Sequence, residues 1–363
     1  MFGFEPTQDQ QTLIEAVRRF SQRELRPHLR SSDESAALPE SSTRAGWELG
    51  LLPASLPEAF GGFGERSALT GVLAAEELAW GGLAGALALM APNLVALPVL
   101  MQGSQQQKQE LLPGFAGEAY VPGSAALQEP RYDFDATALQ TRAERKNGSY
   151  VLSGVKCNVP YAAESEWTLV YAALEGNTQA FLVKRGTPGL RVGERESNMG
   201  VKALPLYGVE LEQCVVPASQ RLGGDAGADV SQLLDASRVA WAALAVGVGR
   251  AAYEYALDYA KNRKAFGEPI AQRQAIAFML AEMPTEVECA RLLVWEAAWL
   301  LDQGQPASRE AYLARNLADD MALMSADRAV QILGGHGYIR DYPVELWLRD
   351  ARAFAVLEGL AIV

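Results

Sequence analysis

Histidine and cysteine are scarce in this chain of 363 residues, and their placement supports no metal site. The only histidines are His28 and His336, and the three cysteines, Cys157, Cys214 and Cys289, show no CxxC spacing. A zinc site usually needs four nitrogen or sulfur ligands, so none is expected. An odd number of widely spaced cysteines also predicts no disulfide framework, as in a reducing compartment.

Positive charge is also in deficit. The chain has 32 Lys and Arg against 44 Asp and Glu, and its formal net charge is −12. Such a chain has no bulk attraction for nucleic acid or anionic membranes, so local basic groups must bind any phosphorylated ligand. We expect no nucleic-acid partner.

A long uninterrupted apolar run is missing as well. The most apolar stretch, residues 83–101, contains Pro92, Asn93 and Pro98, which predicts a buried helix with a break and not a membrane span. The N-terminus has no basic segment followed by an apolar run, so no signal peptide is expected. These absences predict a cytoplasmic protein without membrane insertion.

What is present is a globular composition, 49% apolar and 21% charged, arranged in three parts. The first part is helical: Thr7 is a suitable N-cap, and helical spacing recurs at 40–51, 67–80 and 105–115. The middle part has short β-prone runs separated by Gly, Pro and Asn. Within it, Asn147-Gly148 predicts a hairpin turn.

Three long helical segments follow from about residue 229. In the last of them, one stripe of large apolar residues is assigned to the core and not to a cofactor site: Leu313, Leu317, Met321, Met324 and Ile332. The predicted fold class is therefore α+β and mostly α. It consists of an N-terminal helical domain (1–118), a central β-barrel or sheet domain (119–222) and a C-terminal four-helix bundle (223–363).

Motifs in the last part are the most specific feature of the chain. They are Arg263-Lys264-Ala265-Phe266-Gly267, Gln331-Ile332-Leu333-Gly334-Gly335-His336-Gly337-Tyr338 and Leu357-Glu358-Gly359. With Leu56-Pro57-Glu58-Ala59-Phe60-Gly61-Gly62 in the first part, they resemble the acyl-CoA dehydrogenase family over nearly the whole chain. The resemblance implies an acyl-CoA dehydrogenase-like fold, FAD as cofactor, an acyl-CoA thioester as substrate, an electron-transfer flavoprotein as acceptor and a homotetramer.

By the same resemblance, Glu358 is the catalytic base. Removal of an α-proton from a thioester needs a carboxylate in a dry pocket, while the β-hydrogen leaves as hydride to the flavin. The alternative is a solvated glutamate near a chain end. Asp235, Arg238 and Gly359 are implied substrate contacts, although Asp and Arg three residues apart on a helix can also form a surface ion pair.

The resemblance also implies cofactor contacts at Arg263, Phe266, Gln274, Gln331, Gly334 and Gly335. An arginine fork suits the pyrophosphate of FAD, and the alternative is an exposed basic pair at a helix end. A glycine pair lets the backbone approach a ligand, and the alternative is a helix C-cap. In the family, the positions of Arg263, Phe266, Gln274 and Gln331 reach across a subunit interface to a neighbour's FAD. The resemblance implies no catalytic role for His336, so we expect it to be a structural residue of the turn.

The chain departs from the family pattern where it should face the flavin. Gln128 and Leu360 each replace a Thr, Phe134 replaces a Ser, Asn158 replaces an aromatic residue and Pro160 replaces a Thr. The chain also ends at Val363, ahead of the helix that usually follows. Asn supplies no aromatic face and Pro no hydroxyl or N–H, so a weaker hold on FAD is expected.

Three functions are compatible with these residues. The leading hypothesis is FAD-dependent α,β-dehydrogenation of an acyl thioester. A second is a flavin-impaired family member that acts as a structural or site-completing subunit of a hetero-oligomer. A third is a flavin monooxygenase of the same fold, against which the retention of Glu358 argues.

Overall fold

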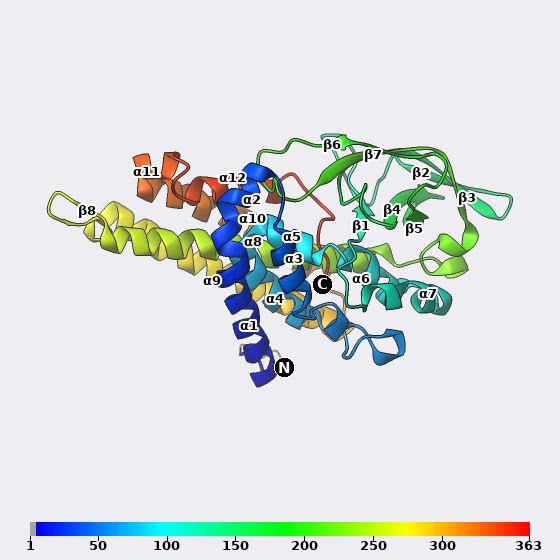
Figure 1. Cartoon of the computed structure of the whole chain (residues 1–363), viewed down its shortest axis with the longest axis horizontal. Coiled ribbons are helices and arrows are strands. Elements are labelled where there is room, and N and C mark those ends of the chain that lie inside the picture. Colours follow the sequence, from blue (N-terminus) through cyan, green and yellow to red (C-terminus); the bar gives the residue numbers. More distant parts are fainter. Residues whose placement is uncertain (1–4) are drawn as a thin grey trace.

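The computed structural model describes residues 5–363, and its first part is helical (Figure 1). Its helices are α1 (Gln8–Phe20), α2 (Leu29–Ser35), α3 (Glu40–Trp47), α4 (Ala68–Gly81), α5 (Leu83–Met90), α6 (Asn93–Gln102) and α7 (Gln105–Phe115). The side chains of Thr7 and Gln10 each accept the other residue's backbone N–H, so the predicted N-cap is confirmed. The predicted segments at 67–80 and 105–115 are helical, whereas the segment at 40–51 ends early, at Trp47.

Helices α5 and α6 form the apolar stretch that the sequence singles out. They are separated at Ala91 and Pro92, and about two thirds of their residues are buried. Among the described residues, no single helix is long and apolar enough to cross a membrane. Only α5 and α6 taken together reach that length and apolarity, and they are bent by 46° at their break.

The middle of the chain forms a sheet, as predicted. Its strands are β1 (Ser124–Ala126), β2 (Arg142–Lys146), β3 (Ser149–Pro160), β4 (Trp167–Leu174), β5 (Asn177–Lys184), β6 (Leu190–Arg195) and β7 (Leu206–Pro217). Their order is β1-β4-β2-β3-β7-β6, with β5 paired to β4. Asn147 and Gly148 join β2 to β3 with φ of 50° and 75°, which confirms the predicted hairpin turn because such turns need positive φ at both positions.

Helix returns in α8 (Val230–Asn262), α9 (Gln274–Asp302) and α10 (Ser308–Leu333), followed by α11 (Gly335–Tyr338) and α12 (Val344–Phe354). The three long helices lie side by side, and α12 packs against α8 and α10 (Figure 1). A hairpin of β8 (Lys264–Ala265) and β9 (Glu268–Pro269) joins α8 to α9 at the far end of the bundle.

The core face of α10 differs from the predicted stripe. Met321 and Ile332 are buried as expected, but Leu313 is 42% exposed. The buried face is dominated by alanines: Ala311, Ala314, Ala318, Ala322, Ala326 and Ala329. Leu317 and Met324 are partly buried and pack against the same core, so only Leu313 departs from the predicted stripe. Small side chains let α10 approach α8 closely.

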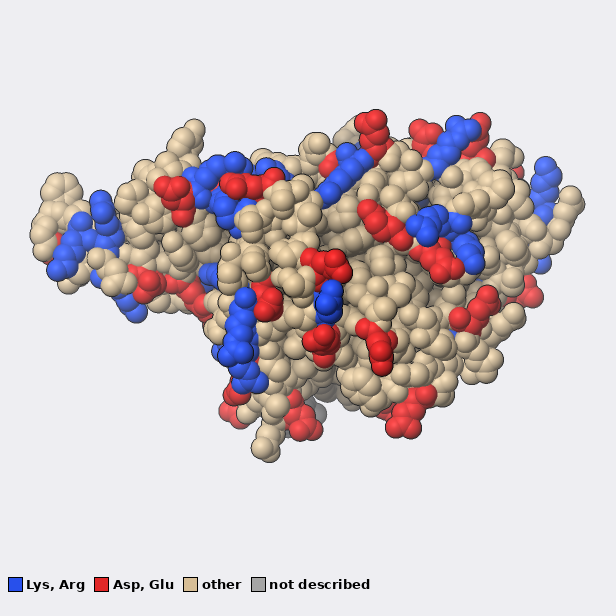
Figure 2. Space-filling view, viewed as in Figure 1, with Lys and Arg blue, Asp and Glu red and all other residues tan. Residues whose placement is uncertain are grey.

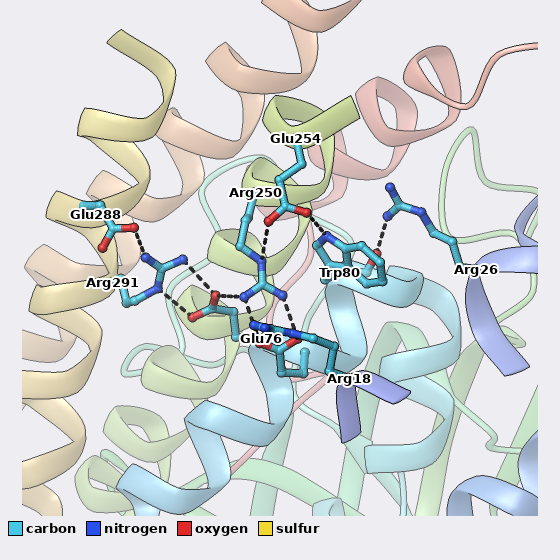
Figure 3. A network of polar contacts seen from close by, with 9 residues as sticks. Arg18, Arg26, Glu76, Trp80, Arg250, Glu254, Glu288 and Arg291 are labelled. Atoms are coloured by element: carbon cyan, nitrogen blue, oxygen red, sulfur yellow. Dashed lines mark hydrogen bonds and ion pairs between the residues drawn. The ribbon is translucent and has the colours of Figure 1, made fainter. Parts of the chain in front are cut away.

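A buried network of charged side chains joins the first helices to the bundle (Figure 3). Glu76 and Glu77 of α4 are 6% and 3% exposed. Arg250 of α8 donates to both carboxylates at 2.7–2.8 Å. Arg291 of α9 donates to Glu76, and Arg18 of α1 donates to Glu77. Both buried carboxylates are paired, which offsets the cost of their desolvation.

The segment after α12 returns to the centre of the molecule. Residues 360–363 are 1–3% exposed, and Figure 1 shows the end of the chain beside α6. The side-chain amide of Asn93 on α6 donates to the Ile362 carbonyl at 3.3 Å. This packing fixes the course of the preceding turn, which lies between the bundle and the sheet.

Candidate active site

Glu358 lies half-buried in the turn that follows α12. The backbone N–H groups of the two preceding residues both donate to the Ala353 carbonyl, at 3.1 and 2.8 Å. Gly359 has a φ of 78°, and a Cβ there would meet the Leu127 side chain at 2.9 Å, so this position favours glycine. Within the described residues, the Glu358 carboxylate forms no hydrogen bond or ion pair.

Two side chains of α10 approach this turn. Arg315 donates to the carbonyls of Phe354 and Leu357, each at 3.1 Å. Its Nε donates to Asp319 at 2.8 Å. Burial raises the pKa of the Asp319 carboxyl to about 6; Arg315 opposes this shift, and the nearby charge of Glu358 adds to it. Sequence reasoning missed both residues.

An apolar cavity adjoins the turn. Its lining comes from α6, β1, β4, α8 and the residues after Glu358, and includes Leu127, Leu234, Ser237 and Gly359. Its volume is only about 10 Å³. An acyl group could enter here only by displacing these side chains, and a short group would displace the fewest.

The side of the sheet that faces the turn is closed by amide side chains. Gln128, just beyond β1, donates to the Val356 carbonyl at 2.7 Å and accepts from Asn158 at 3.2 Å. Asn158 has a φ of 53° and lies at an irregularity in the register of β3. Pro160, two residues further along, is buried. The polar side chains of this wall, defined here by Gln128, Asn158 and Pro160, are therefore bonded to each other and to the turn.

The other two departures from the family pattern are apolar parts of the core. Phe134 is partly buried and packs against the core cluster that contains Leu94 and Tyr171. Leu360 is 2% exposed. Neither side chain presents a polar group to the wall.

Lys156 lies under the wall, and sequence reasoning did not single it out. Its side chain is fully buried, and its ammonium donates to the Leu127 carbonyl at 2.9 Å and to Glu129 at 3.1 Å. Glu129 also accepts two backbone N–H bonds at 2.7 and 2.8 Å. Burial lowers the pKa of Lys156 to about 8, and Glu129 opposes this shift. The pair fixes the backbone on both sides of Gln128.

Asp235 and Arg238 lie together near the start of α8, as their spacing predicts. Arg238 donates to Asp235 at 3.3 Å, and the Ser308 hydroxyl donates to the other carboxylate oxygen at 2.5 Å. Asp235 is 5% exposed, so the pair is not a surface ion pair. Ser237, between them in sequence, lines the apolar cavity together with Gly359.

The residues implied to bind FAD lie at the opposite end of the bundle, which we call the tip: Arg263, Phe266, Gln274, Gln331, Gly334 and Gly335. Phe266 is 96% exposed on the β8–β9 hairpin. Figure 2 shows Lys and Arg side chains gathered at this end. Within the described residues, the side chains of Arg263, Gln274 and Gln331 form no hydrogen bond or ion pair.

The length of α8 separates the tip from the turn that carries Glu358. Trp241 of α8 donates to the Phe354 carbonyl at 3.3 Å, which places the turn level with Trp241. Arg263 follows 22 residues later, and at 1.5 Å per residue this is roughly 33 Å. The tip and Glu358 of one chain therefore cannot contact the same reacting group.

Gly334 and His336, at the end of α10 and just after it, have structural roles. Gly334 ends α10 with a φ of 58°, as expected of a helix C-cap. His336 bonds the Tyr259 hydroxyl at 2.7 Å and stacks on Tyr342 with ring centroids 4.9 Å apart. His336 therefore has the structural part that the sequence predicts.

The tip and the wall differ in how well they fit FAD, the cofactor that the family resemblance implies. The unbonded Arg263 guanidinium at the exposed tip suits the phosphates of such a cofactor. At the wall, the hydrogen bond between Gln128 and Val356 links the sheet to the turn that carries Glu358. The residues present fit the phosphate end of FAD, whereas the polar side chains of the wall are used in bonds within the chain.

Comparison with known proteins gives matches along the whole chain. The family models described as acyl-CoA dehydrogenase N-terminal, middle and C-terminal domains match residues 7–119, 124–214 and 226–361. The probable acyl-CoA dehydrogenase YngJ of Bacillus subtilis (strain 168) is 37% identical over 368 residues, covering 98% of this chain and 96% of that protein.

Solved structures agree with these matches. Butyryl-CoA dehydrogenase from Megasphaera elsdenii superposes with a TM-score of 0.90 at 31% identity, covering 98% of this chain and 96% of that one. PigA, solved as an FAD complex, superposes with a TM-score of 0.88 at 25% identity, covering 98% and 95%. The chain belongs to the acyl-CoA dehydrogenase family.

Proposed function

We propose that this protein is an FAD-dependent dehydrogenase that converts an acyl-CoA thioester into its α,β-unsaturated product, with Glu358 as the base. The observation that supports this most directly is the Glu358 carboxylate. It is half-buried, it bonds no other group within the described residues, and the next residue, Gly359, lines an apolar cavity. Its oxygens are therefore available to accept a proton.

Each residue near the turn has a proposed part in the reaction. Glu358 takes the α-proton on a carboxylate oxygen and leaves the electron pair on the substrate. Gly359 and Leu127 keep this space apolar, while Asp235 and Arg238 line the path of the thioester. Bound FAD would accept the β-hydrogen with its electron pair as hydride, so that a carbon–carbon double bond forms.

A short acyl group is the proposed substrate class. The cavity beside Gly359 has a volume of about 10 Å³, so we expect an acyl group to displace lining side chains, and a short group to displace the fewest. The similarity to butyryl-CoA dehydrogenase supports the same choice. The electrons are proposed to pass on to an electron-transfer flavoprotein.

The tip is proposed to complete the FAD site of a neighbouring subunit in a tetramer. Its residues are Arg263, Phe266, Gln274, Gln331, Gly334 and Gly335. They are exposed, and α8 separates them from their own Glu358 by roughly 33 Å. In this arrangement residues 1–118, 119–222 and 223–363 form three domains. The turn that carries Glu358 lies between the second and the third.

A visible spectrum tests the proposal. The full chain is loaded with FAD, its absorption is recorded, and butyryl-CoA is added without oxygen. We expect a flavin spectrum that bleaches on addition, with the unsaturated thioester as product. Octanoyl-CoA and palmitoyl-CoA should bleach it more slowly.

Two outcomes would contradict the proposal in different ways. A chain that binds no FAD at micromolar concentration overturns the assignment of the cofactor. A chain that binds FAD and is not bleached by any of the three thioesters overturns the assignment of the reaction.

A further inference from the structure

The turn that carries Glu358 is held from the bundle side by two helices. Arg315 of α10 donates to the carbonyls of Phe354 and Leu357, and Trp241 of α8 donates to the Phe354 carbonyl. These oxygens lie at the C-terminal end of α12 and just beyond it, where helix geometry supplies no partner. The residue directly ahead of Glu358 is thus bonded to α10.

Arg315 is itself fixed. Its side chain is 13% exposed, its Nε donates to Asp319 at 2.8 Å, and its guanidinium lies 5.6 Å from the centre of the Trp241 ring. The other carboxylate oxygen of Asp319 is buried without a hydrogen bond. One nitrogen of an arginine side chain can donate to a carboxylate while another donates to two carbonyls. The single ammonium group of lysine can form only some of these bonds.

We propose that Arg315 is a positioning residue for the Glu358 base, which it serves by fixing the backbone directly ahead of that residue. The inference rests on the proposed function. Because the Glu358 side chain bonds no other group within the described residues, the contacts that hold this residue in place act on its backbone. A displacement of about 1 Å at a reacting group can cost about 10²-fold in rate.

Two independent measurements test this role. Hydrogen exchange at the amides of Val356 and Leu357, which bond the Ala353 carbonyl, reports how firmly the turn is held, with or without turnover. Steady-state kinetics of the FAD-loaded protein with butyryl-CoA reports the position of the base. The variants are Arg315→Gln, Arg315→Lys, and Arg315→Gln combined with Asp319→Asn, which avoids an unpaired buried carboxylate.

In Arg315→Gln and in the double variant we expect exchange at these amides to be about 10-fold faster. We expect kcat to fall by about 10²-fold, with KM changed by less than about 3-fold. Arg315→Lys should recover at least about 10-fold of the lost kcat. The control is Arg309→Gln on the same helix, because Arg309 is 80% exposed and pairs only with Glu310; it should change neither quantity.

The outcomes separate the possible failures. Unchanged exchange and kcat in Arg315→Gln overturn the inference. A lower melting temperature with unchanged exchange and kcat also overturns it, because Arg315 is then only a brace of the bundle. If Arg315→Gln does not fold, Arg315→Lys decides by the same two measurements. A wild-type protein that no thioester bleaches contradicts the proposed function instead.

Discussion

The wall and the tip are both implied to contact FAD, and they differ in how their polar groups are used. At the wall, Gln128 bonds both Asn158 and the Val356 carbonyl, so its identity is explained by contacts within the chain. At the tip, the side chains of Arg263 and Gln331 bond nothing within the described residues. Contacts within the described chain therefore do not explain their identity.

This difference predicts how substitutions divide. A change at the tip removes contacts with a ligand or a neighbouring subunit, so binding should suffer while the stability of the chain does not. A change at the wall removes contacts within the chain, so stability should suffer.

Glu358→Gln should have the largest effect on the reaction. The amide cannot take the α-proton, so the rate of flavin bleaching by butyryl-CoA should fall by about 10²–10⁴-fold, the usual contribution of a positioned base. FAD binding and the flavin spectrum should be retained. Asp320→Asn, an exposed carboxylate on α10, is the control. Undiminished bleaching in Glu358→Gln would remove Glu358 from the role of base.

Lys156→Met should cause the largest loss of stability. It removes the ammonium partner of the buried Glu129, which keeps only Arg131 as a cationic neighbour, at 3.5 Å, among the described residues; breaking a buried pair costs up to about 3–5 kcal/mol. Urea unfolding measures this loss, and Lys146→Met, at an exposed lysine of β2, serves as the control. Combining Lys156→Met with Glu129→Gln should restore part of it. If the single variant is as stable as the wild type, the wall does not depend on this pair.

Arg263→Gln should affect binding alone. Loss of a charged hydrogen bond to phosphate costs about 1.5–3 kcal/mol, so the Kd for FAD should rise by roughly 10- to 150-fold. The free energy of unfolding of the protein without FAD should stay within about 0.5 kcal/mol of the wild-type value, since the side chain is exposed and unbonded. Lys264→Gln makes the same change of charge beside it and should leave Kd nearly unchanged. An equal loss in both variants would mean that net charge, and not the arginine fork, binds the cofactor.

Local signals in the sequence predicted most of the fold. The N-cap at Thr7 and the hairpin at Asn147-Gly148 depend on residues close in sequence, and both are confirmed. The predicted stripe of α10 packs on the core except at Leu313, and the alanines that fill most of the buried face were not predicted. Leu313, a large apolar residue, remains at the surface.

The candidate site was less accessible to prediction, because its contacts join segments far apart in sequence. Gln128 bonds a carbonyl 228 residues later, and Arg315 bonds carbonyls 39 and 42 residues later. An arginine on a helix and a lysine in a strand, as at Lys156, are usually solvated, so neither residue type marks a buried contact. The family resemblance identified Glu358, but it could not reveal which side chains hold the turn.

Gln128→Ala should have the smallest effect and is the sharpest test of the wall. It removes the hydrogen bond to the Val356 carbonyl, and we expect this bond to compete with a flavin ring beside Glu358. At about 1 kcal/mol for such a bond, FAD should bind about 5-fold more tightly, as measured by fluorescence titration. Gln140→Ala, at an exposed glutamine of the same sheet region, should leave the affinity unchanged. Weaker binding in Gln128→Ala would mean that this amide contacts the cofactor itself. A ligand contact would then explain the residue at this position of the wall, as proposed for the tip.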